Sequence, residues 1–319
     1  MKELDRLSDQ WIRRQIIEMF GNQRHCLPPI IAGILIILLA GFFTPSTATE
    51  GGGGAYSNGA DDFNAGRLLP PGTYFFNYFN YHYADRLKDN SGHTIPVNFS
   101  YEVTGNGFRL FHVTKAKVLG SHIGMYVILP VAHIHVTYLN KSQSKTGLAD
   151  MTINPFVLGW HFTDWHIGVG VDVKVPTGDY SRFDIANLGR NYWTFEPTFA
   201  FTYLNKEGYE VSAKMMYDVN TKNNATNYLS GQEFHVDYTL GKKIDKFNIG
   251  IGGYYYKQIT DDERNGVKVR DYKGQVLAVG PQLRYNHNKM SFILKYQQET
   301  LVKNRSEGEK FWFKFIYRF

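Results

Sequence analysis

Apolar and polar residues alternate from Gly72 to Phe319, in segments of about ten residues separated by turn residues. Because successive side chains of a strand point to opposite faces, this alternation predicts strands with one apolar and one polar face. A strand that crosses an outer membrane needs about 9–11 residues, which matches these segments. We expect twelve strands, near residues 72–84, 97–114, 121–138, 150–162, 165–175, 191–204, 208–218, 232–241, 246–258, 271–285, 290–300 and 310–319.

The two faces of each segment differ consistently in polarity. In 165–175, a row of β-branched residues opposes His166, Asp172 and Lys174. A lysine or arginine facing lipid near the bilayer midplane costs roughly 2–4 kcal/mol, so the charged faces must point into the lumen. The pattern predicts an all-β fold, a transmembrane antiparallel β-barrel of about 12 strands. Pro197 lies inside a predicted strand, and because it lacks a backbone N–H we expect a bulge there.

The last predicted strand, 310–319, has the most contrasting faces. Aromatic residues occupy every second position from Phe311 to the end, and Lys310, Lys314 and Arg318 lie on the other face. Such a strand would promote aggregation in water but suits contact with lipid. A terminal Phe preceded by alternate aromatics also resembles the carboxy-terminal signature of Gram-negative outer-membrane barrels. That resemblance implies an assembly signal read by the barrel assembly machinery, carried by Phe315, Tyr317 and Phe319.

The predicted connections alternate between short and long. Short ones include 163–164 and 205–207, and the long ones are 85–96, 139–149, 176–190, 219–231, 259–270 and 301–309. Outer-membrane barrels have short periplasmic turns and long extracellular loops, so this alternation favours such a barrel over a soluble sandwich. An even number of strands also places both ends of the barrel region on the periplasmic side.

An apolar run, 30–43, precedes the predicted barrel. Its length suits the core of a signal peptide and is short for a membrane-spanning helix. Small residues follow it at 46–48, so we predict a signal peptide over residues 1–48, with Met19 as an alternative start. The other interpretation is an amphipathic helix followed by a membrane anchor.

Cleavage after Ala48 would remove Cys26, the only cysteine, which suits passage through an oxidising periplasm. Residues 49–71 are rich in glycine and irregular in pattern. We interpret them as a flexible periplasmic N-terminal segment that could enter the lumen as a plug. Residues 72–319 are the predicted outer-membrane barrel.

The composition argues against several functions. The net charge of +6 is spread without a basic cluster, so no nucleic-acid partner is expected. The mean hydropathy of −0.34 excludes a helical membrane protein, whereas lumen-facing and lipid-facing residues of a barrel average out to such a value. There is no G-x-S-x-G motif or phosphate-binding loop, so we expect no enzyme, no catalytic residues and no cofactor. The pairs His133/His135 and His161/His166 are too small for metal sites, so no metal is expected.

The predicted lumen carries charges of both signs: Asp172, Lys174, Glu196, Lys214, Asp218, Glu233, His235, Asp237, Lys295, Lys314 and Arg318. These groups either pair with one another and close a narrow barrel, or guide a substrate through it. Twelve strands lie between the roughly 8 that side chains can fill and the roughly 16–18 that leave an aqueous channel, so a narrow conduit is expected. We expect Glu196 and Lys214 to pair across adjacent strands.

Long loops would receive a substrate first. In and beside the connection 176–190, Tyr180, Phe183 and Tyr192 are the residues expected to capture an apolar compound.

Several segments resemble one family, the outer-membrane proteins named for the meta-pathway of phenol degradation. The segments are GLADMTINP (147–155), DVKVPTGDY (172–180), LGRNYWTFEPTFAFTY (188–203) and SGQEFHVDY (230–238). The resemblance implies a barrel in the outer membrane of a Gram-negative bacterium, in contact with its lipid. It also implies a transporter or channel for uptake of small hydrophobic or aromatic molecules. The alternatives are a structural or surface-binding barrel without transport and an outer-membrane hydrolase.

Overall fold

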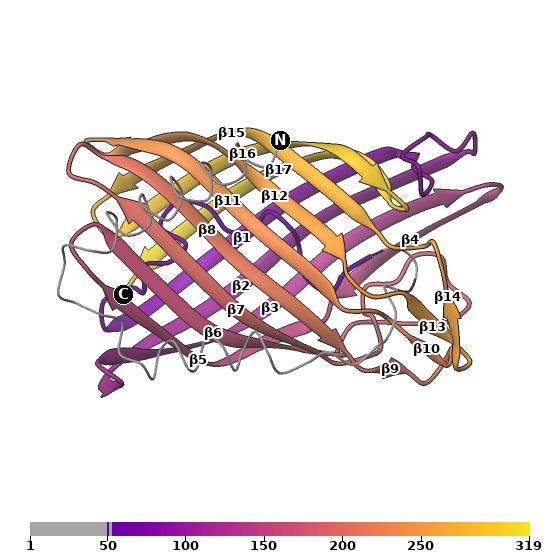
Figure 1. The fold of residues 1–319 in the computed structure, drawn as a ribbon, viewed down its shortest axis with the longest axis horizontal. Coiled ribbons are helices and arrows are strands. Elements are labelled where there is room, and N and C mark those ends of the chain that lie inside the picture. Colours follow the sequence, from indigo (N-terminus) through magenta and orange to yellow (C-terminus); the bar gives the residue numbers. More distant parts are fainter. Residues whose placement is uncertain (1–49, 51–52) are drawn as a thin grey trace, which may run out of the picture. The chain divides into compact units, whose positions relative to one another are not determined.

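The structure, a computed structural model, describes residues 50 and 53–319, so the predicted signal peptide lies outside the described residues. The named elements are all strands (Figure 1). They are β1 Gly72–Leu87, β2 Phe99–Val118, β3 Ser121–Tyr138, β4 Lys141–Leu148, β5 Met151–His161, β6 Trp165–Val175, β7 Thr194–Leu204, β8 Tyr209–Asn220, β9 Lys222–Asn223, β10 Tyr228–Leu229, β11 Glu233–Ile244, β12 Phe247–Gln258, β13 Asp262–Arg264, β14 Val267–Val269, β15 Gln275–His287, β16 Met290–Lys303 and β17 Ser306–Arg318. Among the described residues, no helix is long and apolar enough to cross a membrane.

Twelve of these strands close into an antiparallel barrel. Their order around the wall is β1, β2, β3, β5, β6, β7, β8, β11, β12, β15, β16 and β17. The last strand returns to the first, with Tyr74 opposite Arg318 and Leu87 opposite Ser306. Each of the twelve strands is therefore paired on both sides, which leaves no open edge to lipid. The predicted transmembrane barrel of about 12 strands is confirmed.

Burial follows the predicted alternation of side chains. On β11, Glu233, His235 and Asp237 are buried, whereas Leu240 on the opposite face is 56% exposed. The exposed face of the wall carries an apolar belt that includes Phe195, Val211, Leu240, Ile249, Ile251, Leu283 and Leu294. The polar faces therefore point inward and the apolar faces outward, as lipid requires.

The connections divide between the two ends of the barrel. At one end, called the short-turn end, tight turns such as residues 245–246 and 288–289 join neighbouring strands. At the other, called the loop end, residues 176–193, 221–232 and 259–274 form long connections. A small sheet at the loop end, in the order β14, β13, β10, β9, was not predicted from the sequence pattern (Figure 1).

Two of the predicted long connections are wrong. Residues 141–148 form β4, which pairs with the outer part of β3. These residues are polar on both faces, so they show no alternation that would predict a strand. The predicted connection 301–309 is a tight turn between Lys303 and Ser306, with Asn304 at a φ of 50°. Asparagine tolerates this left-handed conformation better than most residues.

The bulge expected at Pro197 is also wrong. Val171 of β6 lies opposite Pro197, and the register of β7 with both neighbours is unchanged across this position. The missing N–H removes one possible ladder bond, but the register does not change. A register shift occurs instead around the proline of β5, where the pairing with β6 changes between Ile153 and Val157, on either side of Pro155.

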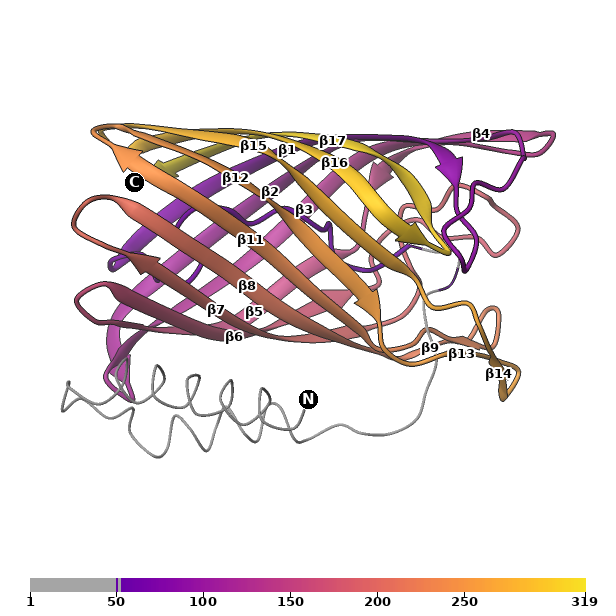
Figure 2. The same ribbon diagram turned by 45° about the horizontal axis from the view of Figure 1, so that its top comes forward.

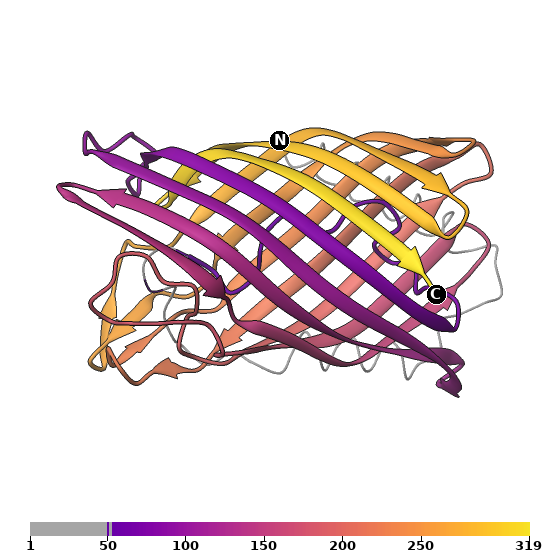
Figure 3. The same ribbon diagram turned by 180° about the vertical axis from the view of Figure 1, so that it is seen from behind.

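Residues 53–71, which we call the plug, run inside the barrel (Figures 2 and 3). At the loop end, Glu50 accepts a hydrogen bond from Asn223 Nδ2 at 2.6 Å. At the short-turn end, Tyr74 OH donates to Pro70 O at 2.7 Å. The sequence predicts a flexible periplasmic segment that could enter the lumen as a plug, and the structure places residues 53–71 along the lumen.

Lysine substitutions on the apolar belt should destabilise the barrel according to their depth. Ile251→Lys, well inside β12, should lower the free energy of unfolding by roughly 2–4 kcal/mol. Ile244→Lys, at the end of β11, should cost about 1 kcal/mol or less because the lysine reaches the interface. Urea unfolding in lipid vesicles measures both. Equal costs at the two positions would contradict the proposed orientation of the wall.

Candidate functional site: the plugged lumen

Two wall lysines on adjacent strands bind the plug backbone and one of its carboxylates. Lys295 of β16 donates to the carbonyl oxygens of Gly59 at 2.5 Å and Ala60 at 3.1 Å. Lys314 of β17 donates to Ala60 O at 2.8 Å and lies 2.6 Å from Asp62. The carboxylate of Asp62 is also 3.4 Å from Lys295. The plug thus neutralises positive charge that the wall alone would leave buried and unpaired.

The second plug carboxylate pairs with the opposite side of the wall. Lys214 of β8 lies 3.0 Å from Asp61 and 3.8 Å from Asp172 of β6. Its ammonium group is also 5.5 Å from the ring centre of Tyr56, so the plug surrounds this lysine with two kinds of partner.

Wall carboxylates bind the amide groups of the plug. Asp237 of β11 accepts hydrogen bonds from the backbone N–H groups of Gly59 and Asp61, each at 2.9 Å, and from Tyr56 OH at 2.7 Å. Since β11 presents Asp237 on its inward face, one side chain satisfies three plug donors.

Close backbone packing fixes the plug nearer the short-turn end. Asn64 N donates to Glu210 at 2.5 Å, and Gly66 N donates to Thr202 Oγ1 at 3.0 Å. A Cβ added to Gly66 would lie 2.5 Å from backbone carbons of Phe201. Only glycine therefore lets the plug approach the wall so closely.

Apolar side chains fill the lumen at the short-turn end. Leu68 of the plug packs into an aromatic cluster formed by Tyr74, Phe76, Tyr78, Phe111, Val113, Tyr126 and Trp312. The Arg109 guanidinium carbon lies 3.5 Å from the ring centre of Tyr126 and 4.7 Å from that of Phe111. These rings hold a buried cation through their faces, which is favourable where water is excluded.

The expected pair of Glu196 and Lys214 is wrong. Lys214 lies opposite Ala200 in the register of β7 and β8, which is two same-face steps from Glu196. Glu196 instead pairs with Lys174 of β6 at 3.3 Å, because Asp172 of β6 is its direct cross-strand neighbour and Lys174 the next inward residue. The prediction assumed a turn at residues 205–207, whereas Leu204 pairs with Glu210. The observed register therefore places Glu196 and Lys214 one same-face step farther apart than expected.

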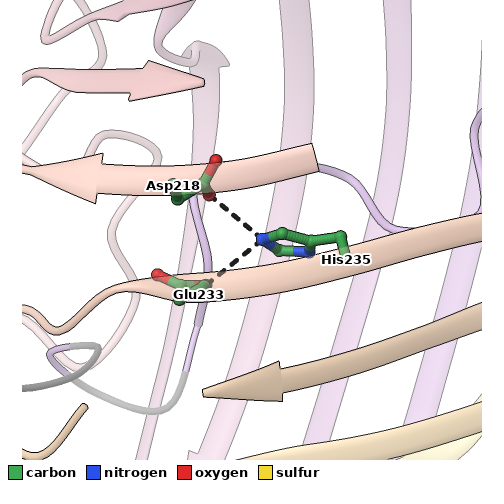
Figure 4. A group of neighbouring side chains, drawn as sticks. All are labelled: Asp218, Glu233 and His235. Carbon is green, nitrogen blue, oxygen red and sulfur yellow. Dashed lines mark hydrogen bonds and ion pairs between the residues drawn. The ribbon is translucent and has the colours of Figure 1, made fainter. Parts of the chain in front are cut away.

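A fully buried cluster of three residues lies toward the loop end of the lumen (Figure 4). His235 Nε2 lies 3.1 Å from Asp218 Oδ2 and 3.7 Å from Glu233 Oε2. His235 Nδ1 lies 2.5 Å from Oδ1 of Asn58 in the plug. The structure therefore brings three of the predicted lumen residues together with one another and with the plug.

The remaining predicted lumen residue, Arg318, lies at the mouth of the barrel. It is exposed, and its guanidinium carbon is 5.8 Å from the ring centre of Tyr74. The three aromatics of the predicted assembly signal alternate on the outer face of β17 and beyond its end, with Phe319 63% exposed.

The three predicted capture residues have different environments. Phe183 is 81% exposed, whereas Tyr192 is buried. The hydroxyl of Tyr180 accepts a hydrogen bond from Asn223 Nδ2 at 2.8 Å. Only Phe183 thus presents its ring fully to the outside.

Several lumen residues were missed, although a signal for some of them was present. Glu210 shares the inward face of β8 with Lys214, and Arg109 alternates with Phe111 on β2, so extending the period-two pattern would have found both. Asp61 and Asp62 lie in a segment without periodicity, and only the tertiary structure places them in the lumen.

Residues 84–315 match the family described as "Putative MetA-pathway of phenol degradation". The COG4313 outer membrane channel from Pseudomonas putida F1 is similar in structure, with a TM-score of 0.73, 16% identity, and coverage of 81% of this chain and 99% of that one. The beta domain of the Bordetella autotransporter BrkA is a weaker match, with a TM-score of 0.46, 10% identity, and coverage of 78% of this chain and 100% of that one. No curated protein matches the sequence.

The closed wall, the apolar belt and the inward charges define an outer-membrane β-barrel protein of a Gram-negative bacterium. Within that class, the chain belongs to the family described as the MetA-pathway of phenol degradation, as the sequence segments indicated.

A buried acid in the small loop-end sheet should make that sheet sensitive to pH. Burial, together with the nearby carboxylates of Glu50 and Asp261, raises the pKa of Asp262 to about 7. The folded sheet therefore holds this proton more tightly than the unfolded segment does, so its stability should fall as pH rises from about 4 to 7. A spin label at Val267, which is 69% exposed, should become more mobile over this range.

The variant Asp262→Asn should abolish the pH response of the label, because asparagine has no proton to lose. Asp261→Asn, which changes the neighbouring and more exposed carboxylate, serves as the control and should keep most of the response. A label whose mobility does not change between about pH 4 and 7 would contradict the assignment.

Proposed function

We propose that this protein is an outer-membrane channel for uptake of small hydrophobic or aromatic compounds, and that displacement of the plug opens it. The observation that carries the proposal is that a separate segment of the chain, rather than the wall itself, occupies the lumen. Plug groups accept from Lys295 and Lys314 and donate to Asp237. A barrel of purely structural use would fill its interior with wall side chains.

The contacts of the plug suit a reversible closure. Most of them are hydrogen bonds and ion pairs, and water can replace such partners when the segment leaves. Some wall residues beside the plug have no side chain. At Gly159, for example, an added Cβ would lie 2.4 Å from Leu68 of the plug. Removal of the plug would therefore leave space in the lumen.

The aromatic cluster supports an apolar cargo. Phe76, Phe111 and Tyr126 surround the plug residue Leu68 at the short-turn end. An apolar compound that replaced Leu68 would contact the same rings, and aromatic rings bury large apolar area. The family also bears the name of a pathway that degrades an aromatic compound.

A sideways exit is part of the proposal. The pairing of β5 shifts register against β3 between Gly124 and Tyr126 and against β6 around Pro155. Register shifts weaken the ladder locally. A separate pocket of about 240 Å³ lies at the junction of β2, β3 and β4, and Gly105 and Ala132 are among the residues that line it.

Neutralising the plug acids should open the channel. In Asp61→Asn/Asp62→Asn, the buried Lys314 loses its carboxylate partner and Lys214 keeps only Asp172 at 3.8 Å. Breaking a buried pair costs roughly 3–5 kcal/mol, so the open probability in planar bilayers should rise on the order of 100-fold or more. Uptake of labelled toluene by cells that express the variant should rise with it.

The matched control, Asp85→Asn/Asp245→Asn, makes the same chemical change at two exposed positions and should behave as the wild type. Deletion of residues 53–66 removes most of the plug and so tests its role. If the deletion variant assembles but conducts no better than the wild type and admits no toluene, the proposed function is wrong and a structural barrel is favoured.

A further inference from the structure

The fold places two carboxylates and an imidazole around one point toward the loop end of the lumen. Glu233 and Asp218 are direct register partners on β11 and β8, and His235 is the next inward residue of β11. Side chains in such positions on one face of a sheet approach each other closely. All three are 0% exposed. Their ligand atoms, one from each residue, lie within 4.8 Å of one another.

A hydrogen bond to the plug decides which ring nitrogen of His235 is available to a ligand. The Oδ1 atom of Asn58 can only accept, so His235 Nδ1 donates to it over 2.5 Å. Nε2 then faces Asp218 Oδ2 at 3.1 Å and Glu233 Oε2 at 3.7 Å. A neutral imidazole would direct a lone pair at two carboxylate oxygens, so either a metal ion or a proton must lie between them.

The charges around the cluster are not balanced by the side chains that contact it. Asp218 Oδ1 and Glu233 Oε2 are buried and have no hydrogen-bond donor among the described residues. A third carboxylate, Glu196, is also 0% exposed, and Lys174 at 3.3 Å is its ion-pair partner. Lys174 also pairs with Asp172 at 3.9 Å, and Arg190, Arg305 and Lys214 act on the cluster only from farther away. Among the described residues, no lysine or arginine forms an ion pair with Asp218 or Glu233. Leaving such charges unpaired is costly, so the site favours a cation.

The spacing of the three ligand atoms fits a small transition metal. With bonds of 2.0–2.2 Å, two ligands of a tetrahedral zinc ion are about 3.4 Å apart. The observed separations from His235 Nε2, 3.1 Å and 3.7 Å, lie on either side of that value. One imidazole nitrogen with two carboxylates suits Zn²⁺ and its first-row neighbours, whereas Ca²⁺ and Mg²⁺ prefer oxygen alone.

We propose that Asp218, Glu233 and His235 form a site for Zn²⁺ or a similar divalent transition metal, and that the metal latches the plug. This departs from the expectation that the protein holds no metal. Asn58 takes the place of the outer partner that metal-bound histidines usually have on their second nitrogen.

A second plug residue covers the site. A Cβ added to Gly54 would lie 2.7 Å from Glu233 Oε2, so this glycine allows the plug to close over the carboxylate. Metal and plug therefore stabilise each other's position, and by linkage each should bind more tightly when the other is present. The latch rests on the proposed opening of the channel, whereas the metal site does not.

Metal binding by the purified protein tests the site. The mature protein, stripped with EDTA in detergent, should bind one equivalent of Zn²⁺ in isothermal titration and retain it on dialysis. Asp218→Asn and His235→Gln remove direct ligands and should weaken binding at least about 100-fold, and Asn58→Ala should weaken it about 10- to 100-fold. Asp245→Asn removes an exposed carboxylate in the turn after β11, at the opposite end of the barrel, and should leave zinc binding unchanged.

Absence of zinc binding to the wild type at about 100 µM free metal, or binding that the ligand variants leave unchanged, would overturn the site. In that case bound protons, and not a metal ion, neutralise the carboxylates of Asp218 and Glu233. X-ray absorption of the zinc-loaded wild type gives a result that does not depend on folding of the variants. It should show nitrogen and oxygen ligands, including one imidazole, and a first shell without imidazole would also overturn the site.

Conductance separates the latch from the channel. Zinc should lower the open probability of the wild type and EDTA should raise it, with no response in Asp218→Asn. Zinc bound at one equivalent without effect on an active channel would refute the latch alone. A protein that binds zinc but conducts under no condition would refute the proposed function and leave the metal site standing.

Discussion

A polypeptide inside the hydrocarbon of a bilayer has no water with which to pair its peptide groups, and an unpaired group costs several kcal/mol. In this protein the pairing of β17 with β1, from Tyr74 opposite Arg318 onward, satisfies that requirement by closing the sheet. Once the sheet is closed, each strand has one face in lipid and one in the lumen. The apolar belt and the inward charges are both consequences of that division.

The charged side chains that face the lumen impose a second requirement, because each buried charge needs an opposite charge or a hydrogen-bond partner. Lysines on β8, β16 and β17 cannot all be neutralised by the wall, and the plug supplies Asp61, Asp62 and several carbonyl oxygens to them. The wall acid Asp237 binds plug amides in return. The plug is therefore an electrostatic complement of the wall. An interior held by such bonds can exchange them for water more readily than a packed apolar core can release its side chains.

The sequence pattern predicted the strands well where lipid imposes alternation and poorly where it does not. Residues 141–148 and the short strands β9, β10, β13 and β14 lie in stretches without regular alternation. Their side chains have no single apolar face, so period-two reasoning does not detect them. The position of a proline in the sequence also does not show whether the strand register shifts there. The chain contains Pro155 and Pro197, but only the pairing of neighbouring strands shows that the register shifts at the first.

The sequence by itself determined the barrel, its number of strands and which residues of each strand face the lumen. Lipid on one side and the lumen on the other require apolar and polar residues to alternate along each strand, and this alternation is visible in short stretches of sequence. The tertiary structure alone decided which lumen residues meet. Lys214 pairs with Asp61 rather than Glu196, and His235 meets Asp218, Glu233 and Asn58. These contacts depend on strand register and on the path of a segment without periodicity, and neither leaves a local pattern in the chain.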